Sequence, residues 1–176
     1  MKDETIFKVT PSGLDYALKC KRCLWLSNKG VRLDAFFPPI FNAFDLIQKK
    51  FLITQSVKLI SEALPDGRIM TELNGFIGSS VLEDKKGRSF VINGKTDVVI
   101  EFKTDPKKYG IIDLKTTNIN PSKINNYKLQ LESYATIFQN PNSKTPKFSD
   151  IGELGLYLFE PKEITKISDG AWNMKF

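Results

Sequence analysis

The residues best suited to chemistry are two acids, a lysine, a glutamine and a tyrosine, and they follow one another in three short motifs. These motifs are Gly94-Lys-Thr-Asp97, Asp113-Leu-Lys115 and Gln130-Leu-Glu-Ser-Tyr134. The two aspartates are 16 positions apart, and Asp113 ends the apolar run Tyr109-Gly-Ile-Ile. Each motif alone is a weak signal. In this order they indicate a metal-dependent site that cuts phosphodiester bonds.

The two acidic motifs suit a pair of neighbouring strands. Side chains alternate along a strand, so Asp113 and Lys115 point to one face and Leu114 to the other. If the preceding strand, which carries Asp97, pairs with this one through the turn at 102–110, both aspartates can converge on one hard cation, and oxygen ligands suit Mg²⁺ or Mn²⁺. Such a metal lowers the pKa of a bound water. Lys115 could position that water or stabilise the charge that develops on the phosphate.

The third motif suits a helix, where Gln130 and Tyr134 are one turn apart and share a face. They could hold a nucleic-acid strand or brace the metal ligands. Each residue also has a plain interpretation: a solvated Asp97, a surface ion pair of Asp113 and Lys115 that is worth little, and an ordinary amphipathic helix. A charge that follows an apolar run is costly to bury unless it is used or paired. The ordered set therefore favours a functional site.

The composition narrows the chemistry further. The chain of 176 residues contains no histidine, which excludes Ser-His-Asp and Cys-His sites and any histidine-ligated zinc. Acid–base and metal chemistry must then rest on carboxylates, lysine, tyrosine or thiols. The net charge of +6 suits a polyanionic partner such as DNA, single- or double-stranded.

The elements that position these residues change in type along the chain. A helix is expected from Pro11, with Ser12 and Asp15 as a capping box. A second helix or pair of helices is expected over 42–63. Short strands in a meander follow over 68–115, then a helix over 125–138 and a buried strand over 154–159.

This order predicts one α/β domain over 1–176, with a helical part at 10–64 and a catalytic core at 68–160. A mixed central sheet is flanked by helices, and the crossover through the last helix makes the final strand parallel to its neighbour. No apolar run approaches the roughly 20 residues that span a bilayer, and the N-terminus lacks a signal-peptide pattern. We expect a cytoplasmic protein with no membrane partner.

At this point the three motifs resemble the PD-(D/E)XK nuclease superfamily, specifically its RecB-like branch, over roughly residues 10 to 160. The resemblance implies a restriction-endonuclease-like αβββαβ core and hydrolysis of DNA with Mg²⁺ or Mn²⁺. It implies that Asp97 and Asp113 bind the metal with the Leu114 carbonyl. Lys115 would be catalytic, with Gln130 and Tyr134 completing the catalytic set.

The N-terminal pattern Ser12-x-Leu-x-Tyr16-x-x-x-Cys20-x-x-Cys23-x-Trp25 is similar to CRISPR-associated RecB-type exonucleases and to small uncharacterised relatives. The similarity implies an exonuclease. Those proteins typically hold an iron–sulfur cluster with four cysteines, whereas this chain has only Cys20 and Cys23. The pair reads as an iron–sulfur remnant, left by loss of the cluster or in a shortened chain that lacks a C-terminal cysteine segment.

Two thiolates do not complete a tetrahedral site within one chain. Cys20 and Cys23 could pair across a dimer, and inert thiols are the expectation. A redox Cys-x-x-Cys motif fits poorly, because the pair lies in a helix-rich start rather than after a strand of a βαβ unit. Relatives also supply a metal ligand, often His or Glu, from an N-terminal helix. Asp45 is the substitute that we expect here, with Glu62 in reserve.

Two other functions remain open. One is a non-catalytic nucleic-acid-binding module on the same scaffold, which would contact phosphates through lysine and arginine. The other is a subunit that docks a DNA-processing partner through Trp25, Phe36 and Phe37.

Overall fold

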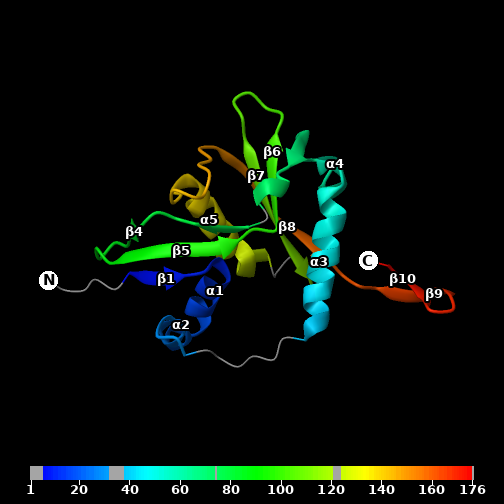
Figure 1. The fold of residues 1–176 in the computed structure, drawn as a ribbon, viewed down its shortest axis with the longest axis horizontal. Coiled ribbons are helices and arrows are strands. Elements are labelled where there is room, and N and C mark those ends of the chain that lie inside the picture. Colours follow the sequence, from blue (N-terminus) through cyan, green and yellow to red (C-terminus); the bar gives the residue numbers. More distant parts are fainter. Residues whose placement is uncertain (1–5, 32–37, 74, 121–123, 176) are drawn as a thin grey trace.

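The structure is a computed structural model that describes residues 6–31, 38–73, 75–120 and 124–175 (Figure 1). Its helices are α1 (Pro11–Lys19), α2 (Lys21–Asn28), α3 (Pro39–Ile53), α4 (Val57–Ile60) and α5 (Ile124–Gln139), with a 3-10 turn η1 (Thr71–Leu73). Its strands are β1 (Phe7–Val9), β2 (Gly67–Ile69), β3 (Phe76–Gly78), β4 (Leu82–Glu83), β5 (Ser89–Lys95), β6 (Val98–Phe102), β7 (Tyr109–Thr116), β8 (Ile151–Phe159), β9 (Glu163–Ser168) and β10 (Ala171–Lys175).

The strands form two mixed sheets and a separate hairpin. One sheet has the order β1-β5-β3 with β4 also on β5, the other has the order β2-β6-β7-β8, and β9 pairs with β10. In each four-stranded sheet one pairing is parallel, β1 with β5 and β7 with β8, and the others are antiparallel. The predicted α/β class is confirmed, since the structure combines helices with mixed sheets, but two four-stranded sheets stand where the sequence predicted one central sheet.

The predicted meander is wrong, because the chain changes sheet between β5 and β6. β5 ends at Lys95 and β6 begins at Val98. At this break the Thr96 side chain is buried, and the Asp97 carboxylate accepts a hydrogen bond from the Leu114 N–H. The side chain of Asp97 thus satisfies a backbone donor of β7 at the point where strand pairing with β6 has ended.

The predicted crossover is confirmed. β6 and β7 pair antiparallel through the turn at 103–108, and α5 then returns the chain so that β8 lies parallel to β7. The register places Asp113 beside Leu156 and Lys115 beside Leu158. The helix expected at 125–138 is α5, which is 16 residues long.

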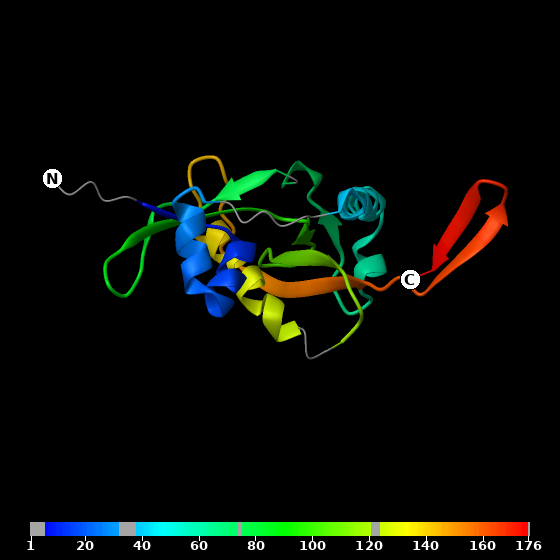
Figure 2. The same ribbon diagram turned by 90° about the horizontal axis from the view of Figure 1, so that it is seen from below.

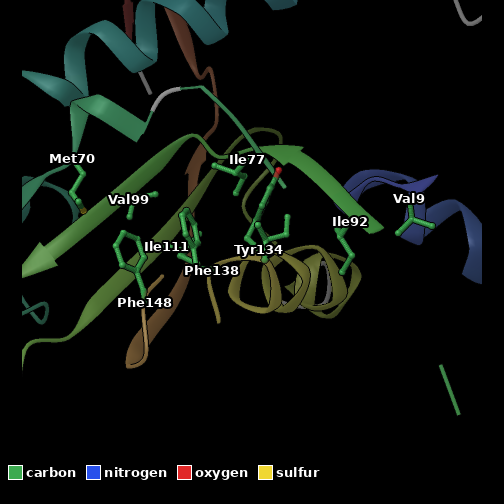
Figure 3. Packing of buried hydrophobic residues seen from close by; sticks show 10 residues of the cluster. Val9, Met70, Ile77, Ile92, Val99, Ile111, Tyr134, Phe138 and Phe148 are labelled. Carbon is green, nitrogen blue, oxygen red and sulfur yellow. The ribbon is translucent and has the colours of Figure 1, made fainter. Parts of the chain in front are cut away.

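The hydrophobic core lies on both faces of β6 and β7. Val99 and Ile111 pack with Phe138 of α5 on one face, as Figure 3 shows. Val98, Ile100 and Ile112 alternate to the other face and pack with Leu52 of α3. Figure 1 shows the β6–β7 pair between these two helices. The two faces of this pair are therefore covered by two helices that are distant in sequence.

The helical part agrees in outline with the sequence. α1 begins at Pro11 as expected, and Thr10 Oγ1 accepts a hydrogen bond from the Gly13 N–H at its start. The expected Ser12–Asp15 capping box depends on the Asp15 side chain, which lies outside the described part of the structure. The segment expected at 42–63 is the pair α3 and α4. Phe36 and Phe37 lie outside the described residues.

Two features of the surface are notable. The β9–β10 hairpin projects from the body of the molecule (Figure 2), and all six residues of β9 are exposed. α3 turns a row of large apolar side chains to the surface: Ile40, Phe41, Leu46, Ile47 and Phe51. Among the described residues, no helix has both the length and the apolar character that a membrane span requires.

Candidate active site

The strand register brings Asp97 and Asp113 together. Val98 pairs with Ile112, so Asp97 stands opposite Asp113, one step beyond the last paired residues. Opposite residues of an antiparallel pair share a face, with Cβ atoms about 5 Å apart. The pairing through the 102–110 turn, which the sequence suggested, thus places both acids at the same end of β6 and β7. Their face is the one that α5 covers.

Asp97 is engaged through both carboxylate oxygens. Its Oδ2 accepts the Leu114 N–H at 2.9 Å, and its Oδ1 lies 2.8 Å from the Nζ of Lys49 on α3. The side chain is 14% exposed, so it borders solvent at the edge of the site. The Leu114 N–H orients one of the two acids, and the expected role of the Leu114 carbonyl as a metal ligand stays a prediction.

Asp113 is more deeply buried, with a side chain that is 3% exposed. Its Oδ1 accepts a hydrogen bond from Gln130 Nε2 at 2.9 Å. Its Oδ2 lies 2.6 Å from Lys115 Nζ, yet within the described residues this oxygen has no correctly directed hydrogen bond. Burial raises the pKa of Asp113 to about 6, although the charge and contact of Lys115 act to lower it. A buried carboxylate with one unsatisfied oxygen is costly, which points to a functional role.

Gln130 and Tyr134 brace the site from α5. Both are buried, and the Tyr134 hydroxyl donates to the Lys95 carbonyl at 2.9 Å, while Gln130 Nε2 reaches that hydroxyl at 3.4 Å. Burial raises the pKa of Tyr134 to about 12, so the phenol stays neutral. In Figure 3 the Tyr134 ring rises from α5 toward the strands. Of the two roles expected for this pair, bracing Asp113 fits the burial, and direct contact with a nucleic-acid strand does not.

Gly94, the first residue of the first motif, has a packing reason. A Cβ there would lie 2.9 Å from Pro11 Cδ and 3.1 Å from Tyr134 Cε1. Only glycine lets β5 approach both the start of α1 and the brace on α5 this closely. At Gly94, the first motif therefore packs closely against both α1 and α5.

We expect Gly94→Ala to lower the free energy of unfolding by about 1–3 kcal/mol, because the added methyl group must displace a rigid proline or the tyrosine ring. Urea unfolding measures the effect. Gly75→Ala is the matched control, since a Cβ there meets nothing within 4 Å. Equal losses in the two variants would show that the close approach at Gly94 is unimportant.

Sequence reasoning missed two residues of α3. Gln48 is buried and its Nε2 donates to Thr116 Oγ1 at 3.0 Å, which fixes the helix to the end of β7. Lys49 Nζ lies 2.8 Å from both Asp45 Oδ2 and Asp97 Oδ1. Burial acts to lower the pKa of Lys49, but its bonds and charge interactions with Asp45 and Asp97 outweigh this and raise it. The available signal was the spacing of Asp45 and Lys49, one turn apart on a helix that is otherwise largely apolar.

The donor set suits a magnesium-like ion. Asp97 and Asp113 supply carboxylates, and Asp113 Oδ2, which has no hydrogen bond among the described residues but lies 2.6 Å from Lys115 Nζ, would ligate the ion with that lysine moved aside. Within the part of the chain that is described, no group of three His, Cys, Asp or Glu side chains gathers at one point, so neither Asp45 nor Glu62 is brought in as a third protein ligand. Mg²⁺ keeps several waters and is often held by one or two carboxylates with substrate phosphates. The residues present therefore fit such an ion.

Comparison with known proteins adds no name to this geometry. The chain matches no protein-family model, no curated protein and no solved structure. The resemblance to PD-(D/E)XK nucleases therefore rests on the three motifs. In the structure these motifs lie at the break between β5 and β6, on β7 and on α5.

The two cysteines lie apart from this site, at the junction of α1 and α2, and they are joined as a disulfide. Cys20 precedes α2 as its N-cap, and its Sγ accepts the Cys23 N–H at 3.1 Å. The expectation of two free, inert thiols is wrong in this structure. A disulfide offers no thiolate, so the pair does not act as an iron–sulfur remnant in this form.

Proposed function

We propose that this protein is a nuclease that hydrolyses DNA phosphodiester bonds with Mg²⁺ or Mn²⁺ at Asp97 and Asp113. The observation that carries the proposal is the Asp113 carboxylate. It is buried at the end of β7, one oxygen lacks a hydrogen bond among the described residues, and Asp97 and Lys115 lie beside it. A buried carboxylate whose second oxygen has only an ion pair with Lys115 is costly for a purely structural role, whereas a metal ligand or a catalytic acid uses such an oxygen.

Each residue has a role that follows from its contacts. Asp97 and Asp113 would hold the cation, which when bound polarises the phosphate and lowers the pKa of a bound water. Gln130 keeps Asp113 in one orientation by its hydrogen bond. Tyr134 anchors the middle of α5 to the end of β5 by donating a hydrogen bond to the Lys95 carbonyl.

Lys115 is held 2.6 Å from Asp113 and is 25% exposed, so its ammonium can reach a phosphate in solvent. There it stabilises the negative charge that develops during cleavage. The net charge of +6 supports a polyanionic substrate, which lysine and arginine contact independently of sequence. Exonucleolytic cleavage rests on the family resemblance.

The proposal is tested by cleavage of end-labelled single- and double-stranded DNA with Mg²⁺, Mn²⁺ or EDTA. We expect cutting with either metal and none in EDTA, and a rate at least about 100-fold lower for Asp113→Ala. Asp169→Ala, which removes a carboxylate that is 98% exposed on the hairpin, should cut like the parent chain. Full activity in Asp113→Ala would exclude this site.

A folded parent chain that cuts neither DNA would favour the second candidate, a non-catalytic subunit. The observation behind it is the row of exposed apolar side chains on α3, since an apolar surface of this kind is typical of an interface with another protein. Copurification of a partner in fixed stoichiometry would then be expected.

A further inference from the structure

The Lys49 ammonium lies where a cation bound to Asp97 would be expected. Its Nζ is 2.8 Å from Asp97 Oδ1, and the other oxygen of that carboxylate is already used by the Leu114 N–H. An ammonium group has only donors, so Lys49 cannot be a metal ligand. It neutralises one of the two acids from a helix that is distant in sequence.

This lysine is held in place by its neighbours on α3. Gln48 donates to Thr116 Oγ1, and Leu52, one turn further on, is fully buried against the sheet. Asp45, one turn earlier, contacts the same ammonium at 2.8 Å and is itself about half exposed. The Lys49 side chain is only 20% exposed. It is therefore bound at the site between two carboxylates.

We propose that Lys49 is a built-in cation that competes with the divalent metal for Asp97 and so sets the metal affinity of the site. This inference rests on the proposed metal-dependent function. With a cation held by Asp97, the Lys49 ammonium would leave Asp97 Oδ1 and would stay paired with Asp45. Asp45 thereby acts on the metal through Lys49, as a positioning residue and without ligating it.

The expected effect follows from charge. An ammonium and a divalent ion compete for the same oxygen and repel each other at short range, and the repulsion is weakened but not removed near a protein surface. Lys49→Met keeps the length of the side chain and removes the charge. We expect it to bind Mn²⁺ about tenfold more tightly than the parent chain.

The experiment titrates Mn²⁺ into the metal-free full chain and follows free Mn²⁺ by electron paramagnetic resonance at fixed ionic strength. Lys50→Met is the matched control, because Lys50 is the next residue of α3 and is exposed. We expect its affinity to stay within about twofold of the parent value. Asp97→Asn should bind more weakly than the parent chain. Circular dichroism confirms folding of each variant, and Lys49→Gln replaces Lys49→Met if the latter does not fold.

The outcomes separate the two proposals. If the parent chain binds Mn²⁺ and Lys49→Met binds no more tightly, the competition by Lys49 is excluded while the nuclease proposal stands. Equal tightening by Lys50→Met would also exclude it, since the effect would then be one of general charge. If only Lys49→Met binds Mn²⁺, the competition is supported in its strongest form. If neither chain binds Mn²⁺, both proposals fail.

Discussion

Asp113→Asn is expected to abolish metal-dependent cleavage and, in EDTA, to stabilise the protein at pH 7 by about 1–3 kcal/mol. The substitution keeps the Oδ1 that accepts from Gln130 and removes a charge from a side chain that is only 3% exposed. Lys115 loses its partner, but it is 25% exposed and can be rehydrated. The buried charge therefore costs more than its ion pair returns, as the raised pKa of Asp113 indicates.

The sign of the pH dependence follows from that pKa. Burial raises the pKa of Asp113 to about 6 from an ordinary value of 3.8, so the folded state holds this proton more tightly than the unfolded state. The contribution of Asp113 to stability is complete below about pH 4 and is lost as the pH rises through about 6. The asparagine variant lacks this loss. Its advantage should grow from pH 4 to 6 and then stay level.

Urea unfolding of the metal-free protein at pH 4, 5, 6, 7 and 8 measures this difference. Asp169→Asn is the control, because it makes the same chemical change at a carboxylate that is 98% exposed and so removes no buried charge. A variant that is less stable than the parent chain at pH 8, or a difference that does not change with pH, would show that the charge on Asp113 is well compensated in the folded protein.

The expected gain in stability bears on function. A site that must bind a cation and a phosphate keeps its acids charged and incompletely satisfied until the ligand arrives. Each acid meets a lysine ammonium through one oxygen, Asp113 through Oδ2 and Asp97 through Oδ1, and the buried Oδ2 of Asp113 has no hydrogen bond among the described residues besides that ion pair.

The acid pair could be anticipated from the sequence because its geometry is local to one hairpin. Once the turn at 102–110 is recognised, the strand register places Asp97 opposite Asp113. The shared face of Gln130 and Tyr134 follows in the same way from helical periodicity. These arguments need only the positions of residues within single elements.

The features that were missed depend on contacts between distant segments. Lys49 is 48 positions before Asp97, and nothing in the local pattern of α3 selects that partner. The change of sheet after β5 coincides with the bond from the Leu114 N–H to Asp97, a contact between two segments that periodicity does not reveal. The disulfide of Cys20 and Cys23 depends on oxidation state, which spacing alone does not give.

Lys115→Met is expected to lower the cleavage rate about 10²–10³-fold while Mn²⁺ binding is retained. Lys115 is fixed by Asp113 on one side, and its Nζ lies 5.2 Å from the centre of the Tyr127 ring on α5. The ammonium is therefore positioned before substrate arrives and can stabilise charge on the phosphate without reorganising. Methionine has a similar length and cannot supply that charge.

Cleavage is measured at saturating Mn²⁺ and at pH 8, since removal of the Lys115 charge would raise the pKa of Asp113 further and leave it partly protonated at lower pH. Lys128→Met is the matched control on α5, where the lysine is 71% exposed.

Comparing the Lys115 and Lys49 variants separates two roles, because each lysine contacts a different aspartate of the pair: Lys49 contacts Asp97 and Lys115 contacts Asp113. Loss of Lys49 should raise metal affinity, whereas loss of Lys115 should remove catalysis with the metal still bound. A Lys115→Met protein that cuts DNA within about threefold of the parent rate would assign Lys115 to charge balance alone.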